Sequence, residues 1–197
     1  MKHSIFYKIR LKFIYLSTQK MNVALVGGHY LEIHSINKND FVFDLGGNLG
    51  NFSSAILDQF GCTCYIVEPN PVLFSQLPKH KNLIPLNYAI TDKEGDIAFE
   101  ISENNEASSV FLSIASKWNY QKTITVRSKT LNNLMIELKI PAIDILKIDI
   151  EGAELVLFKS LSDTDITQIK QISVEFHESF DISLAKDTYK TVRRIAR

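Results

Sequence analysis

Hydrophobic residues recur along this chain with two periods, and the alternation between them predicts strands followed by helices. Short apolar runs have the length and composition of strands buried on both faces of a sheet, and the segments between them repeat apolar residues at helical spacing. Strands are expected at residues 41–45, 64–67, 83–90, 143–150 and 172–176, and helices at 52–60, 71–79, 131–138, 153–161 and 181–197. This order predicts an α/β fold on a parallel sheet.

Two further segments carry a different pattern and predict an insertion into that sheet. Residues 97–102 and 123–128 each alternate apolar and polar side chains, as half-buried antiparallel strands do. The polar stretch 103–107, with Ser108 and Ser109 after it, lies between them. We therefore expect a β-hairpin insertion near the ligand edge of the sheet, where it would cap a substrate.

The stretch from Phe41 to Ser53 organises the rest of the chain. It reads as a buried strand, a turn with three glycines, and a helix that ends at Gly61. Glycines let a backbone approach a ligand closely, and the start of a helix offers unpaired N–H groups. The motif Asp-x-Gly-x-Asn-x-Gly lacks the glycine spacing of a dinucleotide fingerprint and the Gly-Lys-Ser/Thr ending of a P-loop. An acid before the turn suits a ligand with an ammonium group or hydroxyls, such as S-adenosylmethionine; a turn without a ligand is the alternative.

Carboxylates and a histidine gather at the carboxyl ends of the predicted strands, where open α/β sheets bind ligands. Glu68 follows the second strand, about 20 residues past the glycine turn, where a carboxylate can bind both ribose hydroxyls. The whole group is Asp44, Glu68, Asp149, Glu151, Glu175 and His177. Packing alone does not explain so many polar residues at the rim of an apolar sheet.

Five motifs together resemble the FkbM-type family of S-adenosylmethionine-dependent methyltransferases over roughly residues 40–180. They are FDLGGNLGNFS, VEPNP, NYAITDKEGDIAF, DILKIDIEGAELVLFKSL and ISVEFHE. The resemblance implies a class I methyltransferase fold, a Rossmann-like doubly wound sheet. Such a sheet usually continues with two strands beyond the last one predicted here. Without them the chain would be truncated, or an oligomer partner would complete the open edge.

The resemblance also implies roles for individual residues. Gly46, Asn48 and Gly50 would hold the methionine end of the cofactor, and Glu68 its ribose. Asp44 would orient the turn, Asn87 and Ala89 would lie beside the adenine, and Asp149 would face the ammonium group or the acceptor. The predicted cofactor-binding set is Asp44, Gly46, Gly47, Asn48, Gly50, Asn51, Phe52, Glu68, Pro69, Asn87, Ala89, Asp149 and Glu151. The predicted catalytic set is His177 as general base, with Asp149 and Glu175.

Other functions stay open at this point. Asp149, Glu151 and Glu175 would suit Mg²⁺ or Ca²⁺, although no metal is predicted, and Lys147 could simply neutralise Asp149 or another carboxylate. The fold could also serve an inactive or truncated nucleoside-binding module, or a dinucleotide-dependent oxidoreductase. For a methyltransferase, the resemblance favours O-methylation of a small-molecule or sugar hydroxyl.

Composition and charge exclude some partners. The formal net charge is zero and no basic stripe with aromatic residues lies beyond residue 20, so nucleic acid is not expected as a partner. Residues 1–31 form a basic segment ahead of a methyltransferase domain at 32–197. Residues 1–20 would pack on that domain as a helix or lie on an anionic membrane surface. Only Cys62 and Cys64 occur, which favours a reducing, cytoplasmic setting.

Overall fold

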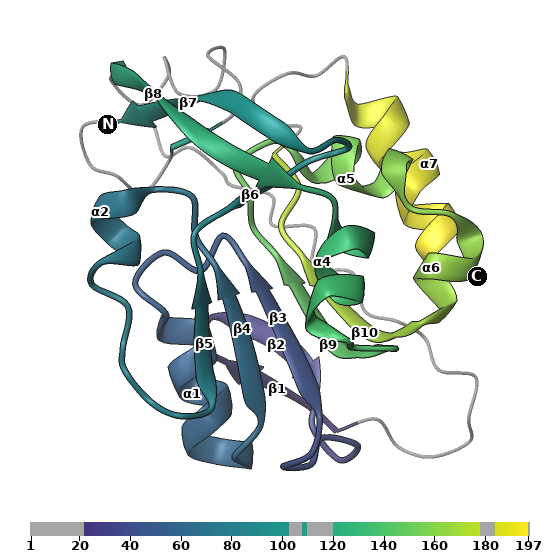
Figure 1. The fold of residues 1–197 in the computed structure, drawn as a ribbon. Helices are drawn as coiled ribbons and strands as arrows, with labels where there is room; N and C mark the ends of the chain where they lie inside the picture. Colours follow the sequence, from purple (N-terminus) through teal and green to yellow (C-terminus); the bar gives the residue numbers. More distant parts are fainter. Residues whose placement is uncertain (1–21, 103–107, 110–119, 178–183, 197) are drawn as a thin grey trace, which may run out of the picture.

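A five-stranded parallel sheet forms the centre of the molecule, in the computed structural model that describes residues 22–102, 108–109, 120–177 and 184–196. Its strand order is β10-β9-β3-β4-β5 (Figure 1). The strands are β3 (Phe41–Leu45), β4 (Thr63–Val67), β5 (Leu83–Leu86), β9 (Ile143–Ile148) and β10 (Ile169–Val174). The central strand β3 pairs with β4 and β9, so its carboxyl end lies in the middle of the sheet edge. The predicted α/β doubly wound sheet is confirmed.

Helices cover both faces of this sheet because alternate strand residues point to opposite sides. On one face, Val42 and Ile66 pack with α1 (Asn51–Phe60) and with a hairpin of β1 (Val23–Val26) and β2 (His29–Glu32). On the other face, Phe43 and Val67 pack in a core with four more helices (Figure 1). These helices are α4 (Leu131–Leu138), α5 (Glu154–Ser160), α6 (Asp163–Thr167) and α7 (Ala185–Ile195). Packing on both faces of the main sheet positions the loops that follow the carboxyl ends of its strands.

A second, three-stranded sheet lies beyond the carboxyl ends of β3, β4 and β5 (Figure 1). Its order is β6-β8-β7, with β6 (Ala89–Ile90), β7 (Gly95–Ser102) and β8 (Tyr120–Lys129). β7 and β8 are antiparallel, which confirms the predicted hairpin insertion. Phe99 on β7 is one of the residues that line a cavity between the two sheets.

Two predicted elements on this side of the sheet are wrong in extent. The strand predicted at residues 83–90 is two strands in two sheets, β5 and β6. Between them, the Asn87 side chain donates hydrogen bonds to the carbonyl oxygens of Glu68 and Pro69, which turns the chain out of the main sheet. The helix predicted at 71–79 is only α2 (Pro71–Phe74). Pro78 disfavours a helical conformation at Leu77, so a helix through residue 79 is not expected.

The last strand and the helix before it also differ from the prediction. β10 begins three residues earlier than predicted and ends at Val174, so Glu175 and His177 follow the strand. The short helix α6 was not predicted, although Ser162 and Asp165 form a capping box at its start. Within the described residues, β10 is the last strand of the main sheet.

The β1–β2 hairpin spans the predicted boundary at residues 31 and 32. Val26 and Leu31 are almost fully buried in the same core as Val42, so the hairpin packs as part of the domain. The predicted membrane contact of residues 1–20 lies outside the described residues. Over the ranges the structure describes, no helix has the length and apolar character needed to cross a membrane.

Candidate functional site

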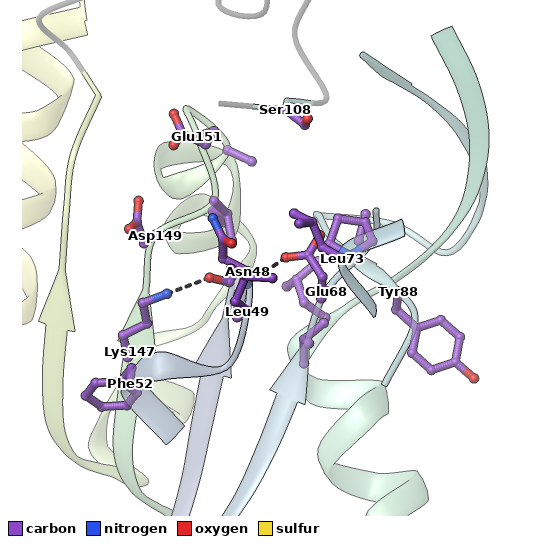
Figure 2. A pocket seen from close by; sticks show the side chains of 18 of the residues that line it. Asn48, Leu49, Phe52, Glu68, Leu73, Tyr88, Ser108, Lys147, Asp149 and Glu151 are labelled. Atoms are coloured by element: carbon purple, nitrogen blue, oxygen red, sulfur yellow. Dashed lines mark hydrogen bonds between the residues drawn. The ribbon is translucent and has the colours of Figure 1, made fainter. Parts of the chain in front are cut away.

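A cavity of about 260 Å³ lies between the carboxyl edge of the main sheet and the three-stranded sheet (Figure 2). Many predicted site residues line it, namely Gly46, Gly47, Asn48, Asn51, Phe52, Glu68, Pro69, Ala89, Asp149 and Glu151. Other predicted residues lie outside this lining, namely Asp44, Gly50, Asn87, Glu175 and His177. The fold therefore brings most of the predicted cofactor-binding residues to one cavity, while His177, the predicted base, lies outside its lining.

Gly46 and Gly47 are required by packing within the protein. Gly46 has a φ of 74°, and a Cβ there would lie 1.8 Å from the carbonyl oxygen of Asp149. A Cβ on Gly47 would lie 2.2 Å from Cγ2 of Ile66. Protein atoms from β4 and from the end of β9 fill the space beside these glycines, so packing already requires glycine at both positions. Because both also line the cavity, their predicted role in binding a ligand stays a prediction.

Glu68 ties the end of β4 to the glycine turn. One carboxylate oxygen accepts the N–H of Asn48 at 2.9 Å and the other accepts the N–H of Asn70 at 2.8 Å. The side chain is only 5% exposed, yet it lines the cavity. Burial raises the pKa of Glu68 to about 7, against the opposing effect of the two N–H donors. The carboxylate is thus fixed in position, and each oxygen keeps a second lone pair for a hydroxyl donor.

A buried ion pair lies beneath the turn. Nζ of Lys147 is 3.0 Å from a carboxylate oxygen of Asp44 and donates to the carbonyl oxygen of Gly46 at 2.6 Å. The other Asp44 oxygen accepts the hydroxyl of Ser53 at 2.8 Å. Burial alone would lower the pKa of Lys147, but the charges of Asp44 and Asp149, the hydrogen bond to Asp44 and the charge of Glu68 together outweigh burial and raise that pKa. Lys147 thus forms a buried ion pair, as the structural alternative expects, and its salt-bridge partner is Asp44.

A second polar cluster forms one wall of the cavity and centres on His177. Its Nδ1 lies 2.9 Å from Glu154, and its Nε2 lies 3.3 Å from Glu151 and 3.7 Å from Asp149. Glu154 is 2% exposed and also accepts the backbone N–H groups of Ile150 and Gly152. One carboxylate therefore fixes both the imidazole and the turn that carries Glu151.

The protonation states in this cluster differ from those of free side chains. Burial lowers the pKa of His177, but the hydrogen bond and charge of Glu154, with the charges of Glu151 and Asp149, raise it to about 9. Burial raises the pKa of Glu151 to about 7, although His177 acts against it. At neutral pH the imidazole therefore carries its proton, which argues against His177 as the resting proton acceptor. Its predicted role as general base stays a prediction.

The metal alternative meets a related obstacle. Donor atoms of Asp149, Glu151 and His177 lie within 4.8 Å of one another, so the third member of this group is the histidine and not Glu175. His177 faces both carboxylates as a proton donor, and it would have to lose that proton to bind a cation. The contacts describe an imidazolium held by carboxylates, and metal dependence stays untested.

Several lining residues carried no functional signal in the sequence. Gly27 and His29 enter from the β1–β2 hairpin, where Nδ1 of His29 lies 3.1 Å from the hydroxyl of Ser173. The Gly27-Gly28 pair predicts a tight turn, but nothing in the local pattern indicates that this turn would reach the site. Ser108 lines the cavity from the insertion, as the cap hypothesis expects.

The comparisons place the chain in a family. Residues 44–194 match the family model described as the Methyltransferase FkbM domain. The chain belongs to the FkbM methyltransferase family. This membership agrees with the resemblance noted in the sequence.

Two relatives extend the comparison of this FkbM-family chain. Hexuronic acid methyltransferase AglP of Haloferax volcanii is 24% identical over 156 residues, which cover 77% of this chain and 62% of that protein. The crystal structure of a methyltransferase FkbM from Methylobacillus flagellatus KT aligns with a TM-score of 0.54 at 12% identity, covering 83% of this chain and 39% of that one. The structural likeness supports the fold. The chain thus spans less than two thirds of either relative.

Proposed function

We propose that the protein is an S-adenosylmethionine-dependent O-methyltransferase that acts on a sugar or another small-molecule hydroxyl. One observation carries this proposal beyond family membership: the cavity joins a fixed strand-end carboxylate, Glu68, to the glycine turn and the first turn of α1, where Asn51 and Phe52 line it. Hydroxyl donors and an amino acid moiety are the groups that such a surface would bind.

The residues present fit this cofactor. Glu68 would accept the ribose hydroxyls, and Pro69, Leu73 and Ala89 offer apolar surface beside it for the adenine. At the other end, the turn from Gly46 to Asn48 and the carboxylate of Asp149 would hold the carboxylate and ammonium of the methionine moiety. When bound, the cofactor supplies a methyl group on a sulfonium, so the protein has to position the acceptor and receive its proton.

The proton-accepting group would come from the cluster of Asp149, Glu151, Glu175 and His177. Asp149 and Glu151 reach the cavity, His177 contacts both of them, and the charge of Glu175 acts on Glu151. Asn51 and Phe52 would contact the cofactor from α1, while Asp44, Gly50 and Asn87 would act by shaping the turn and the end of β4. The AglP relative acts on a hexuronic acid, which makes a uronic acid hydroxyl a reasonable first acceptor to test.

Calorimetric titration separates this function from its alternatives. We expect S-adenosylmethionine and S-adenosylhomocysteine to bind and NAD not to bind. Glu68→Gln should weaken cofactor binding roughly 10- to 100-fold, since a hydrogen bond to a charged group contributes about 1.5–3 kcal/mol. The matched control is Glu137→Gln, which removes a carboxylate paired with Lys129 at the surface. Binding of NAD alone would refute the proposal, and binding without methyl transfer to any acceptor would favour the nucleoside-binding module.

A further inference from the structure

Only some of the ionisable groups in the His177 cluster can touch an acceptor in the cavity. Asp149 and Glu151 line it, with side chains 29% and 20% exposed. Glu154 is buried and occupied by two backbone N–H groups and the imidazole. His177 is 9% exposed and has carboxylates at both ring nitrogens. Proton transfer from a bound hydroxyl therefore falls to Asp149 or Glu151.

The two carboxylates lie at different depths. Figure 2 shows Glu151 at the end of the cavity nearest Ser108, with Asp149 between Glu151 and Lys147. The backbone of Asp149 is pressed against Gly46, at the methionine end of the proposed cofactor site. Ser108 belongs to the insertion, between β7 and β8, and lines the cavity from that side. Glu151 is accordingly the carboxylate on the acceptor side.

The turn that carries Glu151 is held in an unusual conformation from two sides. Glu151 has a φ of 50°, in the left-handed region that residues other than glycine seldom adopt. The Ser109 hydroxyl donates to the Glu151 carbonyl oxygen at 2.6 Å, and Glu154 binds the N–H groups of Ile150 and Gly152 on either side of it. Such restraint of a strained backbone often serves a functional side chain.

We propose that Glu151 is the catalytic proton acceptor and that His177 is a positioning residue, whose Nε2 holds the Glu151 carboxylate toward the acceptor from 3.3 Å away. This inference rests on the proposed methyltransferase function. As the acceptor oxygen forms its bond to the methyl carbon, its O–H proton passes to a carboxylate oxygen of Glu151. The bonding pair of the broken sulfur–methyl bond stays on sulfur, which becomes a neutral thioether. Glu151, whose side chain is 20% exposed, then returns its proton to solvent.

The electrostatics agree with this division of roles. Burial raises the pKa of Glu151 to about 7, a value suited to a base at neutral pH. The charge of His177 lowers it, and those of Asp149, Glu154 and Glu175 raise it. Removing the imidazolium should therefore raise the pKa of Glu151 and move the acid limb of the rate profile to higher pH.

Methyl transfer from S-adenosylmethionine to methyl glucuronoside, with methyl glucoside as the neutral comparison, tests the assignment in the full chain. Glu151→Gln should lower kcat about 10²- to 10⁴-fold with S-adenosylhomocysteine affinity changed less than threefold, while Glu151→Asp retains part of the rate. In the unaltered protein, kcat/KM should fall below about pH 7, and in His177→Gln this limb should lie at higher pH. Glu137→Gln is the surface control.

Each other outcome has a distinct meaning. Full turnover in Glu151→Gln, or an acid limb unmoved in His177→Gln, overturns this assignment and leaves the proposed function standing. Recovery of Glu151→Gln by added Mg²⁺ would make Glu151 a metal ligand and also overturns it. Failure of the unaltered chain to methylate either glycoside, together with failure to bind S-adenosylhomocysteine, would refute the proposed function itself.

Discussion

Replacing Gly46 by alanine should destabilise the protein far more than the same change at Gly28. Both glycines have positive φ, 74° and 89°, but a Cβ at Gly28 meets no atom within 4 Å whereas a Cβ at Gly46 lies 1.8 Å from the Asp149 carbonyl oxygen. The left-handed conformation costs about 1–2 kcal/mol for alanine, offset by about 0.4–1 kcal/mol from the less flexible unfolded chain. Gly28→Ala should therefore lose about 1 kcal/mol.

At Gly46 the clash adds to this conformational term. The carbonyl can retreat only by disturbing the pairing of β3 with β9, including the hydrogen bond from the Asp149 N–H to the Leu45 carbonyl oxygen at 3.1 Å. Each buried backbone group left unpaired costs about 1–3 kcal/mol, so the total loss should be about 3–5 kcal/mol. In a chain of this size that lowers Tm by roughly 10 °C or more, against a few degrees for Gly28→Ala.

Urea unfolding followed by far-ultraviolet circular dichroism measures both free energies under the same conditions. The difference between the two variants isolates the clash, because the backbone strain is common to both. Equal losses in the two proteins would refute the argument that Gly46 is required by packing against the end of β9. Such a result would make ligand binding the reason for glycine at position 46.

Three further predictions concern the buried charges and the roof of the site. Lys147→Met should lower the free energy of unfolding by about 3–5 kcal/mol, because it leaves Asp44 buried without its cation. The double variant with Asp44→Asn should recover more than half of that loss, as measured by urea unfolding. As the control, Lys159→Met removes a surface ion pair with Asp187 and should cost less than about 1 kcal/mol. A double variant no more stable than the single one would contradict this. The pKa of His177 rises from 6.5 to about 9 on folding, so its stabilisation is fully present below pH 6.5 and disappears as pH rises through 9. The stability difference between the unaltered protein and His177→Gln should narrow over that range, by at most about 3 kcal/mol, and a difference independent of pH would be inconsistent with the ion pairs described. Ser109→Ala should lower the free energy of unfolding by about 1 kcal/mol and lower kcat, with little change in cofactor affinity, as measured by calorimetry and turnover. An unchanged kcat would show that catalysis does not need the hydrogen bond from Ser109 to the Glu151 carbonyl oxygen.

The main sheet could be predicted because its strands carry strong local signals. The runs at β3, β4 and β9 are almost continuously apolar, and the glycine turn and the positions of Glu68 and Asp149 after strand ends indicated a site at the carboxyl edge. The strand at residues 83–90 was predicted too long because its apolar pattern continues through the bend. The bend depends on Asn87, whose partners at Glu68 and Pro69 are distant in sequence.

The chemistry of individual side chains was harder to predict for the same reason. Nothing in the sequence indicated that Lys147 would pair with Asp44, about a hundred residues earlier, since the contact depends on β3 and β9 being neighbours in the sheet. The protonation of His177 likewise depends on carboxylates brought together from the turn after β9 and the first turn of α5. Only the assembled edge of the sheet determines which of these groups can release or accept a proton.

The β1–β2 hairpin lies ahead of residue 44, where the match to the family begins, yet it supplies one wall of the cavity. Gly27 is packed so tightly that a Cβ there would lie 2.6 Å from the Cα of Phe52, and Val26 and Leu31 close the apolar face over α1. A recombinant fragment trimmed to the matched region would keep the glycine turn but present bare hydrophobic surface to water. Fragments and chimaeras of this protein should therefore begin no later than residue 22.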